Sequence, residues 1–305
     1  MESPGRAIWA DFSDELALFT ERAGQSVVAL EAKQTHAASA IVWQQGLLVT
    51  ANHSAPHDAL TALLPGGNSA VARVKGRDPS TDLAIFTIES KDEPAAVRGD
   101  AGQLRVGHFV LALARTRRGN LTASAGIISG LMDGWQTWQG GRIDRFIRPD
   151  ITLYRGYSGG PLVNARGEVV GMNTSALRRG TPIAVPTSTV ARVVDELLAK
   201  GHIAQPYLGV ALQPVSLPDN VMAKLKSEAD HGLLIVHVQN NGPAARAGLM
   251  LGDIVTEIAG KPIAQLTRLH GIFGQQRVGD SVTLSIVRSG EPKQISVALG
   301  DRFEQ

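Results

Sequence analysis

Short apolar runs rich in Val, Ile, Leu and Thr follow one another between residues 26 and 172, each bounded by Gly, Pro, Asn or Asp. The runs are SVVALE, SAIVWQQGLLVT, AVARVKGR, DLAIFTIE, HFVLALAR, TASAGIISGL and GPLVNARGEVVGM. Short runs with regular turn signals between them are typical of a β-barrel or a β-sandwich. Gly provides 33 of the 305 residues, which suits a chain rich in turns. The pattern predicts a mainly β fold for this part of the chain.

Helical patterns lie on both sides of the β region. Residues 11–24 carry apolar side chains at helical spacing, so an amphipathic helix is expected near the start of the chain. A second helix, VARVVDELLAKG, has Thr187 and Ser188 as candidate caps and ends at Gly201. The end of this helix predicts the end of a domain.

The remainder of the chain mixes short strands with helices, including a candidate helix near 218–228 and another across 263–275. About 95 residues of this kind form a compact small domain. We therefore expect an N-terminal helical segment at 1–24, a β domain at 25–201, a linker at 202–206 and a small α/β domain at 207–301.

Composition excludes several classes of function. The net charge is only +2 and no stretch concentrates basic residues, which argues against nucleic acid and anionic lipid as partners. Arg115, Arg117 and Arg118 form a small cluster that we expect in a solvated loop. The chain has no Cys, which excludes disulfides and thiolate chemistry, and no cofactor is expected. No apolar stretch predicts a membrane span.

The most specific motif is Gly156-Tyr157-Ser158-Gly159-Gly160-Pro161. Glycines on both sides of a serine let the backbone fold tightly, so that the hydroxyl is exposed and N–H groups converge on one point. Ser158 is therefore a candidate nucleophile, and the N–H groups of Gly156 and Ser158 are candidate oxyanion donors. The alternative is a glycine-rich hairpin with an incidental serine.

A serine nucleophile needs a base, and two upstream residues supply the order His, Asp, Ser. His53 follows an apolar run in LLVTANHSA, and Asp82 precedes one in DPSTDLAIF. Taken alone, each is more often a surface or turn residue. His53 and His57 also have the spacing of a zinc pair, but Pro56 lies between them and no third ligand cluster is evident.

With these residues in place, the chain resembles the HtrA/Deg family of trypsin-like serine proteases that carry a C-terminal PDZ domain. The resemblance covers roughly residues 25–300. It is carried by LLVTANHSA, GRDPSTDLAIFTI, LRVGHFVLAL, GIISGL, GYSGGPLVNARGEVVGMN, IAVPTSTVARVVDELLAKG, YLGV, GPAARAGLMLGDIVTEIAGKPI and GDSVTLSIVRSG.

The resemblance implies a trypsin-like double β-barrel followed by a small α/β PDZ domain. It implies His53 as general base, Asp82 as its orienting partner and Ser158 as nucleophile, with Thr152 near the base of the specificity pocket. Without a carboxylate there, cleavage after small to medium aliphatic residues is expected. Members of the family are ATP-independent, cut unfolded or damaged polypeptides and assemble as trimers.

The PDZ resemblance implies a site for peptide C-termini. Tyr207-Leu208-Gly209-Val210 matches the carboxylate-binding loop of the family, with Leu208 and Val210 lining an apolar pocket. The opposite wall is expected from Leu266, Leu269 and Ile272. Leu208 and Val210 could alternatively be ordinary core residues of a strand.

Some segments depart from the family pattern. Tyr157 and Arg155 replace smaller residues, Ala114-Arg115-Thr116 replaces Gly-Asn-Pro, and Ala38-Ser39-Ala40 replaces Gly-Ser-Gly. No export signal is visible, so the chain is expected in the cytoplasm as written, or outside it if a leader has been removed. The alternative function is an inactive protease fold that acts as a scaffold or holdase through its PDZ domain.

Overall fold

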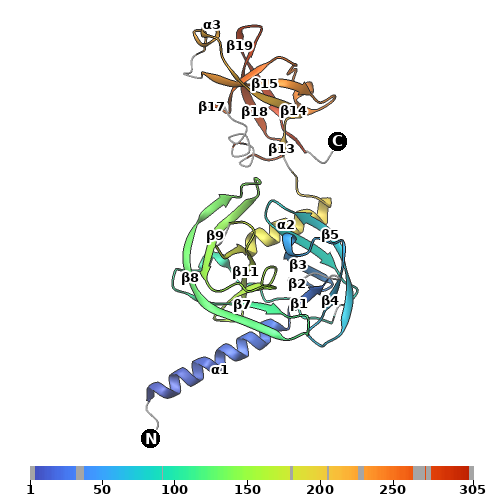
Figure 1. Ribbon diagram of the computed structural model, residues 1–305, viewed down its shortest axis with the longest axis vertical. Helices are drawn as coiled ribbons and strands as arrows, with labels where there is room; N and C mark the ends of the chain where they lie inside the picture. Colours follow the sequence, from blue (N-terminus) through green and yellow to red (C-terminus); the bar gives the residue numbers. More distant parts are fainter. Residues whose placement is uncertain are drawn as a thin grey trace. The chain divides into compact units, whose positions relative to one another are not determined.

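The computed structural model describes residues 4–31, 38–90, 92–178, 181–204, 206–225, 230–263, 272 and 276–301, with side chains from residue 8 on. The chain divides into two compact units, residues 1–203 and 204–305. The first unit contains two closed six-stranded barrels, which confirms the expected double-barrel fold (Figure 1).

The first barrel has the strand order β1-β2-β3-β6-β5-β4, and every neighbouring pair described is antiparallel. Its strands are β1 Val27–Glu31, β2 Ala38–Gln44, β3 Leu47–Ala51, β4 Ala59–Leu63, β5 Ser69–Asp78 and β6 Leu83–Thr87. Closure of the barrel leaves no strand edge unpaired, so strands this short can still form a stable sheet.

The second barrel has the order β10-β11-β12-β9-β8-β7. Its strands are β7 Phe109–Arg115, β8 Leu121–Gln136, β9 Arg142–Asp150, β10 Pro161–Asn164, β11 Val169–Thr174 and β12 Ile183–Pro186. One cluster of buried side chains includes Ile41 and Trp43 from the first barrel and Leu111 and Met172 from the second, so the two barrels share a core.

Two helices complete the first unit. Helix α1 covers Pro4–Gly24, starting earlier than the expected 11–24, and its Phe12 packs edge-on against Phe109 of β7. Helix α2 covers Thr187–Lys200 and ends at Gly201 in the left-handed conformation, as expected. The predicted capping was wrong, because Pro186 is the N-cap and no side chain caps this helix.

Of the three arginines expected in a solvated loop, Arg117 and Arg118 are exposed in the turn after β7, whereas Arg115 is the last residue of β7 and differs from the prediction. Arg115 is only 6% exposed, because its guanidinium donates to the carbonyl oxygens of Gly24, Val27 and Gly119. Burial lowers the pKa of Arg115 from its usual value. The expectation fails for Arg115 because three backbone acceptors, Gly24 and Val27 from a distant segment and Gly119 from the adjacent turn, satisfy the guanidinium.

The second unit is a mixed α and β fold around a six-stranded sheet with the order β14-β15-β16-β18-β19, and β17 pairs with β16. Its elements are β13 Pro206–Tyr207, β14 Val210–Ser216, α3 Asp219–Met222, β15 His231–Val238, α4 Pro243–Arg246, β16 Ile254–Ile258, β17 Lys261–Pro262, β18 Ser281–Arg288, β19 Glu291–Ala298 and β20 Gly300–Asp301. A separate core, including Leu233, Ile235 and Leu284, holds it together. Within the described residues, no helix is long and apolar enough to cross a membrane.

Candidate active site

The pairing of β3 with β6 brings His53 and Asp82 together. Ala51, the last residue of β3, lies opposite Leu83, the first residue of β6. His53 follows in a short 3-10 turn, and Asp82 immediately precedes β6. The end of β3 and the start of β6 are therefore paired, and this pairing places His53 and Asp82 side by side although they are 29 positions apart in the sequence.

Asp82 contacts both the backbone and the ring of His53. Its Oδ1 accepts the backbone N–H of His53 at 2.9 Å, and its Oδ2 lies 2.7 Å from Nδ1. The carboxylate side chain is 4% exposed, whereas the imidazole is 35% exposed. A buried carboxylate on Nδ1 favours the tautomer that carries its proton there, which leaves the lone pair of Nε2 available to act as a base.

The turn before Asp82 explains its unusual backbone. Asp82 has φ of 58°, a left-handed conformation that is uncommon outside Gly but tolerated by Asp. Asp78 stabilises this turn, because its carboxylate accepts the N–H and hydroxyl of Ser80 at 3.0 and 2.5 Å and the hydroxyl of Thr81 at 2.5 Å. Within the segment DPSTD, the first residue, Asp78, therefore supplies the carboxylate that holds the turn before Asp82 in its conformation.

Thr174, at the end of β11, is a site residue that the sequence reasoning missed. Its hydroxyl donates to Oδ2 of Asp82 at 2.5 Å, and the residue is fully buried. Thr174 lies 92 positions from Asp82 and on the other barrel. Nothing in the local sequence marks this contact, because a buried threonine in a strand is ordinary.

The loop around Ser158 folds as the glycine pattern predicts. Gly156 and Gly159 have φ of 93° and 87°, in the region that favours glycine. A Cβ on Gly159 would lie 2.2 Å from the carbonyl oxygen of Ser39 and 2.3 Å from the hydroxyl of Thr50. A side chain at position 159 is therefore excluded by both backbone conformation and space.

Two N–H groups of this loop remain available. Tyr157, Gly159 and Gly160 donate their N–H groups to the carbonyl oxygens of Tyr154, Asn173 and Tyr157. Among the described residues, the N–H groups of Gly156 and Ser158 have no acceptor. These are the two groups expected to hold an oxyanion, because an N–H group without an acceptor in the protein can donate to an oxygen atom of the substrate.

His53 and Ser158 have other partners in this structure. Nε2 of His53 lies 2.9 Å from the hydroxyl of Ser54, and Oγ of Ser158 lies 3.3 Å from the hydroxyl of Ser175. In the part of the chain that is described, no hydrogen bond joins His53 to Ser158. Proton transfer between them therefore requires a change of rotamer.

Two further residues that the sequence analysis considered, Thr152 and His57, lie elsewhere in the protease part. Thr152 is exposed, whereas Ile151 and Tyr157 are buried. His57 offers its backbone carbonyl to Arg77, and the described residues contain no group of three or more His, Asp or Glu that could hold a metal.

In the second unit, the expected carboxylate-binding loop lies between β13 and β14. Gly209 has φ of 78°, and the carbonyls of Leu208 and Gly209 accept the N–H groups of Ala244 and Gln239, both at 2.8 Å. Leu208 is 4% exposed and belongs to the core, against which half-buried Val210 packs.

Three residues were expected in the opposite wall of the peptide site. Leu266 and Leu269 lie outside the described residues. Ile272 is 8% exposed and belongs to the core of the unit.

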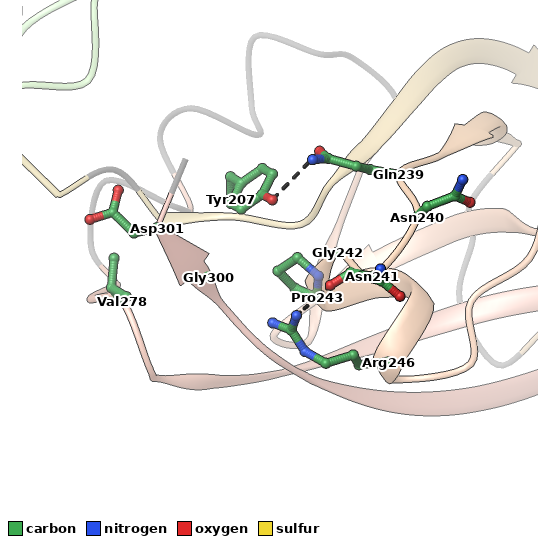
Figure 2. A pocket seen from close by; sticks show the side chains of 10 residues that line it. All are labelled: Tyr207, Gln239, Asn240, Asn241, Gly242, Pro243, Arg246, Val278, Gly300 and Asp301. Atoms are coloured by element: carbon green, nitrogen blue, oxygen red, sulfur yellow. Dashed lines mark hydrogen bonds between the residues drawn. The ribbon is translucent and has the colours of Figure 1, made fainter. Parts of the chain in front are cut away.

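A hollow of ≈ 390 Å³ lies beside this loop (Figure 2). Its lining is Tyr207, Gln239, Asn240, Asn241, Gly242, Pro243, Arg246, Val278, Gly300 and Asp301. The hydroxyl of Tyr207 donates to Gln239 at 3.5 Å, and Arg246 donates to the carbonyl of Asn241. Neither Leu208 nor Val210 lines the hollow, so it is distinct from the apolar pocket expected for a terminal side chain.

Comparison with known proteins agrees with both units. The trypsin-like peptidase domain matches residues 38–172, and the PDZ domain matches residues 206–299. The serine protease Do-like HtrA of Lactobacillus helveticus is 34% identical over 270 residues, which are 84% of this chain and 65% of that protein. A probable periplasmic serine endoprotease DegP-like of Pseudomonas fulva is 33% identical over 85% of this chain and 54% of its own length.

A solved structure of the HtrA-type protease AlgW with a decapeptide matches with a TM-score of 0.66 and 26% identity, over 95% of this chain and 99% of that one. The two barrels and the sheet unit therefore define a trypsin-like peptidase domain followed by a PDZ domain. The chain belongs to the HtrA/Deg family. It spans about half to two thirds of the length of the two curated relatives described above.

Proposed function

We propose that this protein is a serine endopeptidase of protein quality control that cuts unfolded or damaged polypeptides without ATP. The observation that carries this proposal is the buried Asp82 on Nδ1 of His53, together with the N–H groups of Gly156 and Ser158, which have no acceptor among the described residues. An inactive scaffold would need none of these features. The homologous serine proteases support the endopeptidase part of this proposal, and the family resemblance supports the rest.

The catalytic cycle follows from this geometry. Nε2 of His53 takes the proton of Ser158 as Oγ attacks the scissile carbonyl carbon, and Asp82 stabilises the imidazolium that forms. The carbonyl oxygen becomes an oxyanion, which accepts hydrogen bonds from the N–H groups of Gly156 and Ser158. His53 then protonates the leaving amine, and water attacks the acyl-enzyme through the same base.

Before attack, two side chains must exchange partners. The hydroxyl of Ser54 must leave Nε2, and Oγ of Ser158 must turn from Ser175 toward His53. Both are rotations of exposed hydroxyl groups, which occur rapidly. The arrangement in the structure is therefore a resting state from which the proposed triad can assemble.

A fluorophosphonate probe tests the proposed activity, because Ser158 would displace fluoride from its phosphorus. The wild type should be labelled and should digest casein, whereas Ser158→Ala should do neither. Digestion of casein by Ser158→Ala at the wild-type rate would refute the proposal. A wild type that resists labelling would favour the scaffold alternative.

We further propose that the enzyme prefers small to medium aliphatic residues before the cleaved bond. Thr152 stands where a pocket for Lys or Arg would require a carboxylate. Mass spectrometry of casein fragments should show Val, Ala or Ile before most cuts. Mostly Lys or Arg at that position would reject this preference.

The PDZ domain is proposed to bind the free C-terminus of a polypeptide. The left-handed backbone at Gly209 lets a carboxylate approach N–H groups of the loop 207–210, while an added strand would pair with β14. Peptides with an apolar last residue should bind at micromolar strength and lose most affinity on amidation. Equal binding of the free-acid and amidated peptides by calorimetry would contradict this assignment.

A homotrimer is the proposed assembly, on the family resemblance. Trp9 and Phe12 of α1 are 72% and 42% exposed in the single chain, and a subunit interface would cover them. Light scattering at micromolar concentration should give three times the chain mass of 32.3 kDa. A monomeric mass would exclude the trimer.

A further inference from the structure

We infer that Ser39 is the positioning residue of the nucleophile loop, defined as residues 154–160. Ser39 lies in β2 of the first barrel, while the loop belongs to the second. It anchors the two residues, Gly156 and Ser158, whose N–H groups form the oxyanion hole. This inference rests on the proposed function and adds a residue to its machinery.

Ser39 binds the carbonyl groups of both oxyanion-hole residues. Its hydroxyl donates to the carbonyl oxygen of Gly156 at 2.7 Å. Its backbone N–H donates to the carbonyl oxygen of Ser158 at 3.3 Å. One residue therefore restrains the loop at both positions whose N–H groups must point toward the substrate.

The direction of the hydroxyl proton is itself determined. Oγ of Ser39 accepts the backbone N–H of Arg115 at 3.0 Å. The N–H of Arg115 can only donate, so the single hydroxyl proton of Ser39 cannot point toward it. That proton is donated to the carbonyl oxygen of Gly156 instead. The side chain of Arg115 holds the end of β7 in place through Gly24 and Val27.

The loop needs such a restraint because of its glycines. Gly156 lacks a Cβ, so its peptide groups rotate at low cost unless a partner holds them. Ser39 is fully buried, so water cannot replace its hydroxyl as that partner. The hydrogen bond from Ser39 therefore selects one orientation of the Gly156 carbonyl.

Packing supports the same role. A Cβ on Gly159 would lie 2.2 Å from the carbonyl oxygen of Ser39, and a Cβ on Gly160 would lie 3.2 Å from the Cβ of Ser39. The two glycines that follow Ser158 thus allow the loop to lie directly against Ser39. The loop and the strand fit as a pair, and catalytic groups gain precision from rigid supporting contacts of this kind.

The test compares Ser39→Ala with Ser26→Ala. Ser26 is a matched control, since it is buried and its hydroxyl donates to the carbonyl of Ala23 at 2.8 Å, away from the nucleophile loop. The measurements are kcat and KM on a fluorogenic peptide from a mapped casein site, the rate of fluorophosphonate labelling, and the midpoint of thermal unfolding.

Both variants should unfold at lower temperature than the wild type. Only Ser39→Ala should also lose about 10- to 100-fold in kcat and in the labelling rate, with KM little changed. A purely structural role would lower the unfolding midpoint of both variants and leave their kcat values alike. Values of kcat and labelling rate for Ser39→Ala within twofold of Ser26→Ala would overturn the inference.

If Ser39→Ala does not fold, Ser39→Cys decides the question. A thiol keeps the shape of the side chain but is a weak donor, and the chain has no other Cys. The same loss of kcat at unchanged KM is expected, and wild-type kcat in this variant would overturn the inference. Absence of labelling in the wild type would instead refute the proposed function, and the role of Ser39 with it.

Discussion

Thr174→Val should weaken catalysis while filling nearly the same space in the active site. Valine has nearly the volume of threonine and the same branching, and it suits the buried strand β11. The substitution removes the hydroxyl that donates to Oδ2 of Asp82 at 2.5 Å and that accepts the backbone N–H of Ala176 at 3.1 Å. Among the described residues, the carboxylate then keeps its two contacts with His53 alone and is less firmly oriented.

The magnitude follows from the kind of hydrogen bond that is lost. A hydrogen bond to a charged group contributes about 1.5–3 kcal/mol, and each 1.4 kcal/mol is a factor of about ten in rate. The contact matters most when His53 becomes an imidazolium, because Asp82 is then its counter-charge. A decrease of about 10- to 150-fold in kcat/KM is therefore expected.

The assay is the cleavage of a fluorogenic peptide together with the rate of fluorophosphonate labelling. Thr174→Ser keeps the hydroxyl and should retain most of the activity. Thr187→Val removes a different threonine hydroxyl, which donates to the carbonyl of Gly99 at 2.9 Å, and should leave kcat/KM unchanged. Wild-type kcat/KM in Thr174→Val, or an equal loss in Thr187→Val, would refute the reasoning.

Three further changes test other parts of the structure. Gly159→Ala should abolish labelling, because its Cβ would lie 2.2 Å from the carbonyl oxygen of Ser39; labelling of this variant would contradict the prediction. Ser54→Ala should speed labelling about 2- to 10-fold, because the Ser54 hydroxyl no longer occupies Nε2 of His53. A slower labelling rate would show that the Ser54 hydroxyl does not compete with Ser158 for Nε2. Arg288→Met should lower the unfolding midpoint of the PDZ domain by more than about 5 °C, since Asp253 is buried and paired with Arg288 at 2.7 Å; an unchanged midpoint by calorimetry would contradict this.

The same ion pair makes the stability of the PDZ domain depend on pH. Burial raises the pKa of Asp253, but the hydrogen bonds from Arg288 and from the N–H of Met250 outweigh it, so the pKa is lowered overall. A carboxyl with a lowered pKa in the folded state stabilises the fold above its unfolded pKa. This stabilisation is lost as the pH falls through the lower, folded pKa. The difference between wild type and Arg288→Met should therefore be largest near neutral pH and shrink in acid.

The pattern of short strands predicted a β-barrel or a β-sandwich, and the resemblance to the HtrA/Deg family implied the double barrel. The candidates His53, Asp82 and Ser158 came from their motifs in the sequence. Each of these residues stands next to a short apolar strand or inside a glycine-rich turn, so its position depends on local pattern. The antiparallel pairing of β3 with β6 then brings the first two together through a simple register.

Tertiary structure alone revealed the partners of these residues. Thr174 lies 92 positions from Asp82, and Ser39 lies 117 positions from Gly156. Such contacts arise only when two barrels close and pack against each other, and a buried hydroxyl in a strand carries no local signal of its acceptor. The buried Arg115 illustrates the same limit, because its charge predicted exposure, while the distant carbonyls of Gly24 and Val27, together with that of nearby Gly119, allow its burial. Local pattern thus determined the strands and the reactive residues, and only packing between the barrels decided which polar groups hold those residues in place.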